Sequence, residues 1–270
     1  MSEVATVLSV YKKNRLTDLK EVLDSLYKQT RKTDIFIQLD GVVSQEMEKF
    51  LDTQLAIGKI EYLGKRNVNW GIARSHNELF EIVLKRGYIY IARMDADDIA
   101  VVNRIEWQYI FMEKNLNVDV VGGYIEEFGD GITYQKVVKY PLTHDAMFKF
   151  FSKRVPLANP TTFFRKTFFE KAGLYPVTSP SNEDTLMWMN GFHAGCVFAN
   201  IAKVVVKMRV SGDFFKRRGG FPKAYSDLKD RIKVIRTLRY NYRAYFYAIS
   251  LFAVNMAPPR VKFYIYKRLR

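Results

Sequence analysis

Three carboxylates that follow a single apolar run are the strongest sign of chemistry in this sequence. Residues 88–92 are aromatic and β-branched, which predicts a buried strand, and Asp95, Asp97 and Asp98 come directly after it. Carboxylates this close together repel one another unless a cation lies between them. Mg²⁺ and Mn²⁺ take carboxylate and phosphate oxygens together, so the pattern predicts a metal-assisted phosphate site. The alternative is an N-cap for a helix predicted over 102–115, although a cap needs only one of these residues.

Glu183 and Asp184 form a second acidic site, at the start of a helix predicted over 182–191. A carboxylate held against a hydroxyl can remove its proton during attack, which makes this pair a candidate general base. The same pair suits helix capping and the helix dipole, and taken alone the motif favours that alternative.

Two predicted strands, Val4–Val10 and 34–39, end in side chains that suit a nucleotide. Parallel strands bring their carboxyl ends to one edge of a sheet, so Tyr11 and Asp40 are expected beside the acidic cluster. Tyr11 could stack on a base, and Asp40 could accept a hydrogen bond from uracil or ribose. An ordinary turn after the second strand is the alternative for Asp40.

Arginines supply candidate phosphate ligands in two further places. Arg74 lies near the start of a helix predicted over 71–86, where the helix N-terminus favours anions. Arg217 and Arg218 lie in a basic, glycine-containing loop, and guanidinium groups bind phosphate bidentately. Solvated surface charge is the alternative for all three arginines. The sequence contains no glycine-rich dinucleotide motif and no P-loop, which argues against those classes of enzyme.

The segments between these motifs predict an α/β fold that would position them. Strand-like and helix-like segments alternate through the first half, which predicts a Rossmann-like, mostly parallel sheet flanked by helices. The strands predicted in this half are Val4–Val10, 34–39, 60–63 and 88–92, and the helices are 18–29, 44–55, 71–86 and 102–115. The second half is mixed, with strands predicted over 118–125, 133–138, near 197 and over 204–210, and helices over 144–151, 165–171 and 182–191.

The composition is typical of a folded protein from a reducing compartment. Hydrophobic residues make up 48% of the 270 residues, which is enough for a buried core. Cys196 is the only cysteine, which excludes an internal disulfide, and the three scattered histidines argue against zinc. No signal-peptide pattern opens the sequence, and no apolar run reaches the roughly 20 residues that span a bilayer. A cytoplasmic location is therefore expected.

Most of the net positive charge lies in the last fifth of the chain. Residues 216–270 hold fifteen Lys and Arg residues against two Asp, which accounts for +13 of the chain's net +15. Such asymmetry predicts a polyanionic partner, either nucleic acid or an anionic membrane surface. The aliphatic run over 249–254, set among tyrosines and basic residues, favours the membrane surface over nucleic acid.

Taken in order, these segments resemble the family 2 inverting glycosyltransferases with a GT-A fold, above all the bacterial enzymes that build O-antigen, capsule and other surface polysaccharides. The resemblance runs from about residue 4 to residue 220. Its motifs are Val7-Leu8-Ser9-Val10-Tyr11, Gln38-Leu39-Asp40-Gly41, Asn69-Trp70-Gly71-Ile72-Ala73-Arg74, Arg93-Met94-Asp95-Ala96-Asp97-Asp98, Glu183-Asp184 and Arg217-Arg218-Gly219-Gly220.

The resemblance implies how a donor would be held. Tyr11 and Asp40 would contact the nucleotide of a nucleotide-sugar, a UDP-sugar being favoured. Asp95 and Asp97 would form the family's Asp-x-Asp motif, with Asp97 nearest a Mn²⁺ or Mg²⁺ ion.

The resemblance also implies the chemistry and the acceptor. Asp184 would be the catalytic base with Glu183 beside it, and Arg217 or Arg218 would neutralise the departing diphosphate. The acceptor would be a saccharide linked to polyprenyl diphosphate, so the enzyme would work as a peripheral protein on the inner face of the cell membrane.

These inferences divide the chain into a glycosyltransferase domain over 1–220 and an extension over 221–270. The extension is predicted to be a basic, aromatic, helical and amphipathic tail that docks on the membrane or a partner. A non-catalytic membrane- or nucleic-acid-binding protein on a degenerate transferase scaffold is the alternative from another class, and the carboxylates at all three sites argue against it. A nucleotidyltransferase also uses Asp-bound metal, but the early glycine-rich loop of that class is missing here.

Overall fold

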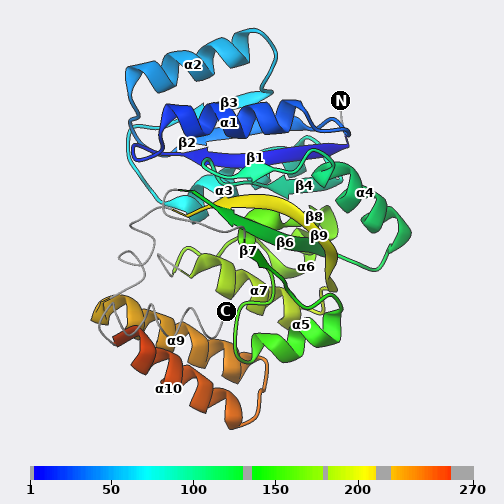
Figure 1. The fold of residues 1–270 in the computed structure, drawn as a ribbon, viewed down its shortest axis with the longest axis vertical. Coiled ribbons are helices and arrows are strands. Elements are labelled where there is room, and N and C mark those ends of the chain that lie inside the picture. Colours follow the sequence, from blue (N-terminus) through cyan, green and yellow to red (C-terminus); the bar gives the residue numbers. More distant parts are fainter. Residues whose placement is uncertain (1–2, 130–135, 179–181, 211–219, 257–270) are drawn as a thin grey trace.

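One sheet and the helices around it make up most of the computed structural model, which describes residues 3–129, 136–178, 182–210 and 220–256 (Figure 1). The strands are β1 Val4–Val10, β2 Asp34–Leu39, β3 Tyr62–Lys65, β4 Tyr90–Arg93, β5 Ile99–Ala100, β6 Val120–Phe128, β7 Lys136–Val138, β8 Phe163–Arg165 and β9 Phe198–Arg209. The helices are α1 Leu16–Tyr27, α2 Gln45–Ala56, α3 Ile72–Lys85, α4 Arg104–Lys114, α5 His144–Phe151, the 3₁₀ turn η1 Asn159–Thr161, α6 Lys166–Ala172, α7 Glu183–His193, α9 Phe221–Thr237 and α10 Arg243–Met256.

The predicted α/β fold is confirmed, and the sheet is mixed in direction. Its strand order is β3-β2-β1-β4-β8-β6-β9-β5, with β7 beside β6. The pairs β1–β2, β2–β3 and β1–β4 are parallel, as the alternation of strands and helices predicts. Beyond β4, the strand β8 runs antiparallel to both of its neighbours, β4 and β6. The strands β6 and β9 are parallel to each other. The predicted parallel pairing is therefore complete in the first half of the chain, whereas the second half combines parallel and antiparallel pairs.

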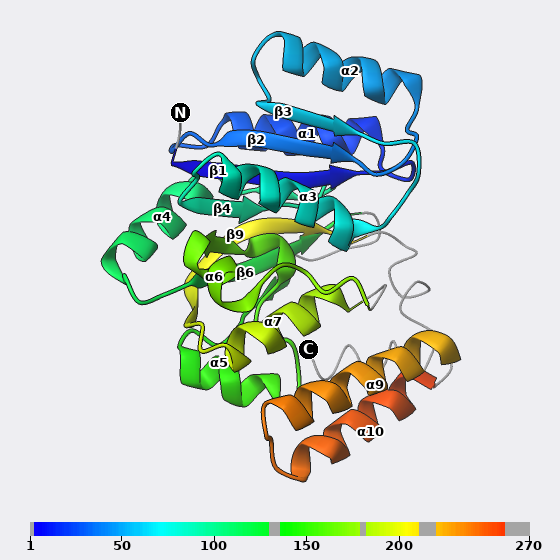
Figure 2. The ribbon, with the colours of Figure 1, turned by 180° about the vertical axis from the view of Figure 1, so that it is seen from behind.

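The sheet is buried on both faces, which explains its nearly continuous apolar strands. Successive side chains of β1 alternate between two core clusters. Val4, Leu8 and Val10 pack in the cluster that includes α1, α2 and α4. Ala5 and Val7 pack in the cluster that includes α3, α5, α6 and α7. The two views of the ribbon show these helices on opposite sides of the sheet (Figures 1 and 2).

The register of the parallel strands brings the predicted site residues to one edge. Val10 at the end of β1 is paired with Leu39 at the end of β2, which is in turn paired with Lys65 at the end of β3. Val7 is paired with Arg93, so β4 ends three residues earlier along the sheet than β1. Tyr11, Asp40, Arg66 and the Asp95 loop therefore all leave the sheet at its carboxyl edge, where ligands bind in α/β folds.

The beginning of the predicted C-terminal extension packs on the rest of the protein. Val234 of α9 belongs to the core cluster of α3, α5, α6 and α7. The Arg231 guanidinium donates to the carbonyl of Phe151 at 2.8 Å, and the Tyr240 hydroxyl donates to the carbonyl of Phe148. The boundary near residue 220 stays a prediction. Among the described residues, no helix combines the length and the apolar character that crossing a bilayer requires.

Candidate functional site

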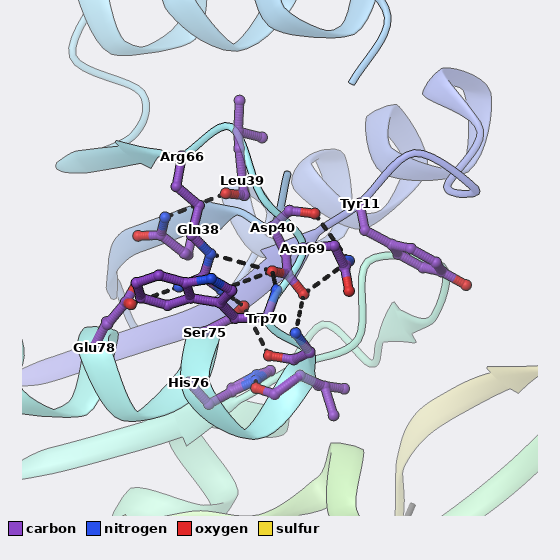
Figure 3. A network of polar contacts seen from close by, with 12 residues as sticks. Tyr11, Gln38, Leu39, Asp40, Arg66, Asn69, Trp70, Ser75, His76 and Glu78 are labelled. Atoms are coloured by element: carbon purple, nitrogen blue, oxygen red, sulfur yellow. Dashed lines mark hydrogen bonds and ion pairs between the residues drawn. The ribbon is translucent and has the colours of Figure 1, made fainter. Parts of the chain in front are cut away.

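Asp40 is the centre of a buried polar network at the carboxyl edge of the sheet (Figure 3). Its Oδ1 accepts from Arg66 Nη2 at 2.7 Å and from the Trp70 backbone N–H at 2.8 Å. Its Oδ2 accepts from the Gly71 backbone N–H at 3.0 Å and from Asn69 Nδ2 at 3.1 Å. Asp40 thus fixes the loop between β3 and α3 to the end of β2. A direct contact between this carboxylate and a nucleotide stays a prediction.

The turn considered as the alternative for Asp40 is also present. Gly41 has φ of +86°, and a Cβ at this position would lie 3.0–3.3 Å from atoms of Asn69. The glycine therefore lets the β3–α3 loop approach the end of β2 closely enough to bond with Asp40.

Arg66 is a site residue that the sequence reasoning missed. It is mostly buried, pairs with Asp40 and Glu78, and also donates to the Ser75 hydroxyl. Its guanidinium lies 5.0 Å from the centre of the Trp70 ring. Its position in the sequence could have indicated this role, because Arg66 directly follows strand β3 just as Asp40 directly follows strand β2.

Tyr11 and Arg74 lie on either side of this network with more freedom. The Tyr11 backbone N–H donates to Asn14 Oδ1 at 2.9 Å, while its ring extends away from the other labelled side chains (Figure 3). Arg74 is exposed, and its guanidinium lies 5.5 Å from the centre of the exposed Trp70 ring. Their roles as base and phosphate ligands stay predictions.

Arg93 and Asp95 form the next part of the site, at the end of β4. Arg93 is only 2% exposed, and its Nη2 lies 2.7 Å from Asp95 Oδ1. The Asp95 side chain is 30% exposed, so it lies where the buried ion pair meets solvent. Beneath them, the fully buried Arg104 donates to the Arg93 carbonyl at 2.8 Å and thus fixes the last peptide of the strand. Burial, and then the neighbouring Arg93, lower the pKa of Arg104 to about 9.

His76 is a buried residue on which the charges of Asp40, Arg93 and Asp95 all act. It is 1% exposed on α3, and its Nδ1 lies 3.0 Å from the Ile72 carbonyl oxygen. Burial and the charge of Arg93 lower the pKa of His76 to about 3, while Asp95 and Asp40 act in the opposite direction. The imidazole is therefore neutral at pH 7, which argues against His76 as a general acid.

Asp98 and Asp97 have different surroundings although they are adjacent. Asp98 is 2% exposed and accepts from the Arg209 backbone N–H at 2.8 Å, which attaches the acidic loop to the end of β9. Burial raises the pKa of the Asp98 carboxyl well above its ordinary value, and Asp95 and Asp97 raise it further. Arg209 Nε donates to the Asp97 carbonyl at 2.9 Å. Arg209 was missed because its role depends on the pairing of distant strands.

The N-cap alternative for the acidic loop is wrong. The short strand β5 lies between this loop and α4, and the N-cap of α4 is Asn103, whose side chain makes no capping hydrogen bond. Arg217 and Arg218, the other predicted diphosphate ligands, lie outside the described residues.

Asp95 and Asp97 suit a divalent metal by their donor chemistry. Both offer carboxylate oxygens at the edge of the sheet, and Mg²⁺ is commonly held by one or two carboxylates together with phosphate oxygens and water. No group of three or more His, Cys, Asp or Glu side chains arranged for a metal occurs among the described residues. Asp95 and Asp97 therefore fit an ion that would take its other ligands from a bound diphosphate and water. The metal assignment stays a prediction.

Glu183 and Asp184 open α7, and the charges of Arg93 and Asp95 act on Glu183. Burial and the charge of Asp184 raise the pKa of Glu183 to about 7, while Arg93 acts in the opposite direction. Burial also raises the pKa of Tyr175, a neighbour of both acids and of Arg93. Asp184 Oδ1 accepts from the Thr185 backbone N–H at 2.6 Å. Neither acid is the N-cap of α7, which is Asn182, although both lie in its first turn. The other oxygen of Asp184, Oδ2, takes no part in the bond to Thr185.

We expect Glu183→Gln to stabilise the protein at alkaline pH. The folded protein retains a proton on Glu183 that the unfolded chain has released, so the native acid costs stability as pH rises from about 4.5 to about 7. Removing the carboxylate should raise the free energy of unfolding by about 2 kcal/mol more at pH 8 than at pH 5. Urea denaturation at both pH values measures the difference. The exposed Glu46→Gln is the control, and equal shifts for both variants would contradict the expectation.

The sequence of this chain matches a protein family model and several known bacterial proteins. The model of the family "Glycosyl transferase family 2" matches residues 7–173. The UDP-Gal:alpha-D-GlcNAc-diphosphoundecaprenol beta-1,3-galactosyltransferase of Escherichia coli is 30% identical over 180 residues, which are 66% of this chain and 65% of that protein. The amylovoran biosynthesis glycosyltransferase AmsE of Erwinia amylovora is 26% identical over 267 residues, 98% of each chain.

The fold also has relatives among solved structures. The crystal structure of GalNAc-T7 with UDP, GalNAc and Mn²⁺ superposes with a TM-score of 0.67 at 17% sequence identity. The superposition covers 98% of this chain and 54% of that one. At this identity the likeness concerns the fold, which agrees with the predicted GT-A architecture.

Proposed function

Because the chain belongs to glycosyl transferase family 2, we propose that it transfers a sugar from a nucleotide-sugar to a hydroxyl of a lipid-linked saccharide, with inversion at the anomeric carbon. We favour a UDP-sugar as the donor and a polyprenyl-diphosphate-linked saccharide as the acceptor. The name of the Escherichia coli relative, which contains UDP-Gal and a diphosphoundecaprenol acceptor, supports both choices. Such an acceptor belongs to bacterial surface polysaccharide synthesis and would place the enzyme on the inner face of the cell membrane.

The observation that carries this proposal is the position of Arg93 between two acidic sites. Its guanidinium pairs with Asp95 on the predicted donor side, and its charge acts on Glu183 at the start of α7. The donor diphosphate and the acceptor hydroxyl would then bind close together, on either side of the buried Arg93. An acid that is held beside a donor site is what group transfer to a hydroxyl requires.

On the donor side, the chain's residues hold the nucleotide and orient the sugar. Tyr11 and the loop held by Asp40 would bind the nucleoside, while Arg74, Arg217 and Arg218 would contact phosphate. A divalent ion held by Asp95 and Asp97 would supply positive charge to the diphosphate.

On the acceptor side, Asp184 would act as the base. As the acceptor oxygen bonds to the anomeric carbon, the bond from that carbon to the diphosphate oxygen breaks, and the electron pair leaves with the diphosphate. Asp184 Oδ2 would take the hydroxyl proton. One displacement from the opposite face inverts the configuration, through an oxocarbenium-like transition state. Glu183, with its pKa near 7, would share the site as the second acid.

Calorimetric titration of the purified chain with UDP, GDP and dTDP, in Mn²⁺ and again in EDTA, tests the donor side. We expect one nucleotide, UDP, to bind with micromolar affinity in Mn²⁺ and at least tenfold more weakly in EDTA. Metal-independent binding would remove the metal role of Asp95 and Asp97 but leave a transferase. If folded protein bound none of the three, the proposed function would fail and the non-catalytic alternative would stand.

A further inference from the structure

Helix α10 presents an apolar face to solvent. Among its 14 residues the only charged side chain is the arginine at its first position. Tyr242, Phe246 and Ile249 follow one another at helical spacing and are 67%, 66% and 59% exposed. On the other side of the helix, Ala244 and Ala248 are buried against α9. Packing against α9 therefore leaves Phe246 and Ile249 of α10, and Tyr242 directly before the helix, mostly exposed.

The exposed face of α9 continues this surface and changes in character along the helix. Phe221 and Tyr225 at its start are each 58% exposed, and their stacked rings lie 6.1 Å apart. Lys229, Lys233 and Arg236 are also exposed and follow at intervals of four, four and three residues. Because this spacing keeps side chains on one face, α9 is aromatic at its start and basic toward its end.

The acidic residues of α9 do not offset these basic side chains at the surface. Asp227 forms an ion pair with Lys223 one turn earlier. Asp230 is buried and accepts from Asn182 Nδ2 at 2.8 Å, at the start of α7. The exposed side chains of α9 and α10 thus include aromatic, aliphatic and positively charged groups.

The helical pair is oriented toward the carboxyl edge of the sheet. α9 and α10 run antiparallel, and the rings of Phe221 and Phe252 lie 6.4 Å apart, which brings the start of α9 beside the end of α10. Both views show these two ends on the same side of the molecule as the arrowheads of β1 and β2 (Figures 1 and 2). The candidate site and the aromatic end of the helical pair therefore lie on one side.

We propose that α9 and α10 form a docking surface for an anionic lipid bilayer. Tyr242, Phe246 and Ile249 enter the headgroup layer, and the basic residues of α9 contact lipid phosphates. Aromatic and aliphatic side chains beside Lys and Arg are the combination that binds such an interface. A second copy fits less well, because a two-fold contact would place the basic face of α9 against itself. The inference rests on the proposed function and deepens it, since docking would hold the enzyme at the surface that carries a lipid-linked acceptor.

The test measures sedimentation of the full chain with vesicles of phosphatidylglycerol and phosphatidylethanolamine, and with vesicles of phosphatidylcholine alone. We expect binding to the anionic vesicles that weakens as salt is raised. The triple variant Tyr242→Ser, Phe246→Ser, Ile249→Ser should bind at least about tenfold more weakly. The matched control is Leu116→Ser, which removes a 74% exposed apolar side chain between α4 and β6 and should bind like the parent.

The outcomes separate docking from catalysis. The docking proposal would be overturned if the folded protein did not sediment with anionic vesicles. It would also be overturned if the triple variant bound them as tightly as Leu116→Ser does. Dimerisation that the triple variant abolishes, without vesicle binding, would assign the face to a second copy. Binding to a single-stranded oligonucleotide but not to vesicles would assign it to nucleic acid. UDP titration reports on the proposed function independently, so vesicle binding without nucleotide binding would leave docking standing while the transferase proposal fails.

Discussion

Asp184→Asn is expected to lower turnover by about 10²–10⁴-fold, because a positioned base contributes a factor of this size and an amide cannot take the proton. The fold should tolerate the change. Asp184 Oδ1 accepts from the Thr185 backbone N–H at 2.6 Å, and an asparagine oxygen can accept the same bond. Nucleotide binding, measured by calorimetry, should stay within twofold of the parent, since the donor residues lie on other elements.

Glu183→Gln is the matched control for this assignment. Both substitutions replace one carboxylate by its amide in the same turn of α7, so a difference in turnover reports the role of each acid. Wild-type turnover in Asp184→Asn would contradict the assignment of the base. If Glu183→Gln were inactive at the same time, the two roles would have to be exchanged. Comparable losses in both variants would indicate that the pair acts as one coupled unit.

The first half of the fold could be predicted because its strands and helices carry their own periodicity. Val4–Val10 and Asp34–Leu39 begin and end where the sequence predicts. The strands β5 and β8 were missed because they have two and three residues and are defined by their partners. The segments near 197 and 204–210, predicted as separate strands, form the single strand β9, whose pairing with β6 shifts register near Gly123 and Tyr124.

The residues of the candidate site also divide into those that could be predicted from the sequence and those that could not. Asp40, Asp95 and Glu183 could be found because acidic residues beside predicted element ends are visible in the sequence. The arginines that hold them were harder to find. Arg104 lies ten residues from the peptide it fixes, on a helix whose sequence gives no sign that this side chain is buried. Arg209 is more than a hundred residues from Asp98. Their roles come from tertiary contacts, which a single sequence does not display.

The second large effect is expected for Asp97→Ala, which should weaken UDP binding in Mn²⁺ by at least about tenfold and leave binding in EDTA unchanged. Alanine keeps the backbone carbonyl that accepts from Arg209 Nε at 2.9 Å, so the attachment of the acidic loop to β9 should persist. Calorimetric titration of the variant with UDP, in Mn²⁺ and in EDTA, measures the two affinities.

Asp95→Ala provides the informative contrast, because its carboxylate has a structural partner. Removing it would leave the guanidinium of Arg93, which is 2% exposed, without its ion pair. Breaking a buried pair on one side is strongly destabilising, typically by about 3–5 kcal/mol. Asp95→Ala should therefore unfold at lower denaturant concentration as well as bind UDP weakly, whereas the main effect of Asp97→Ala should be the loss of metal-dependent binding. If Asp97→Ala bound UDP in Mn²⁺ as tightly as the parent, Asp97 would not be a metal ligand.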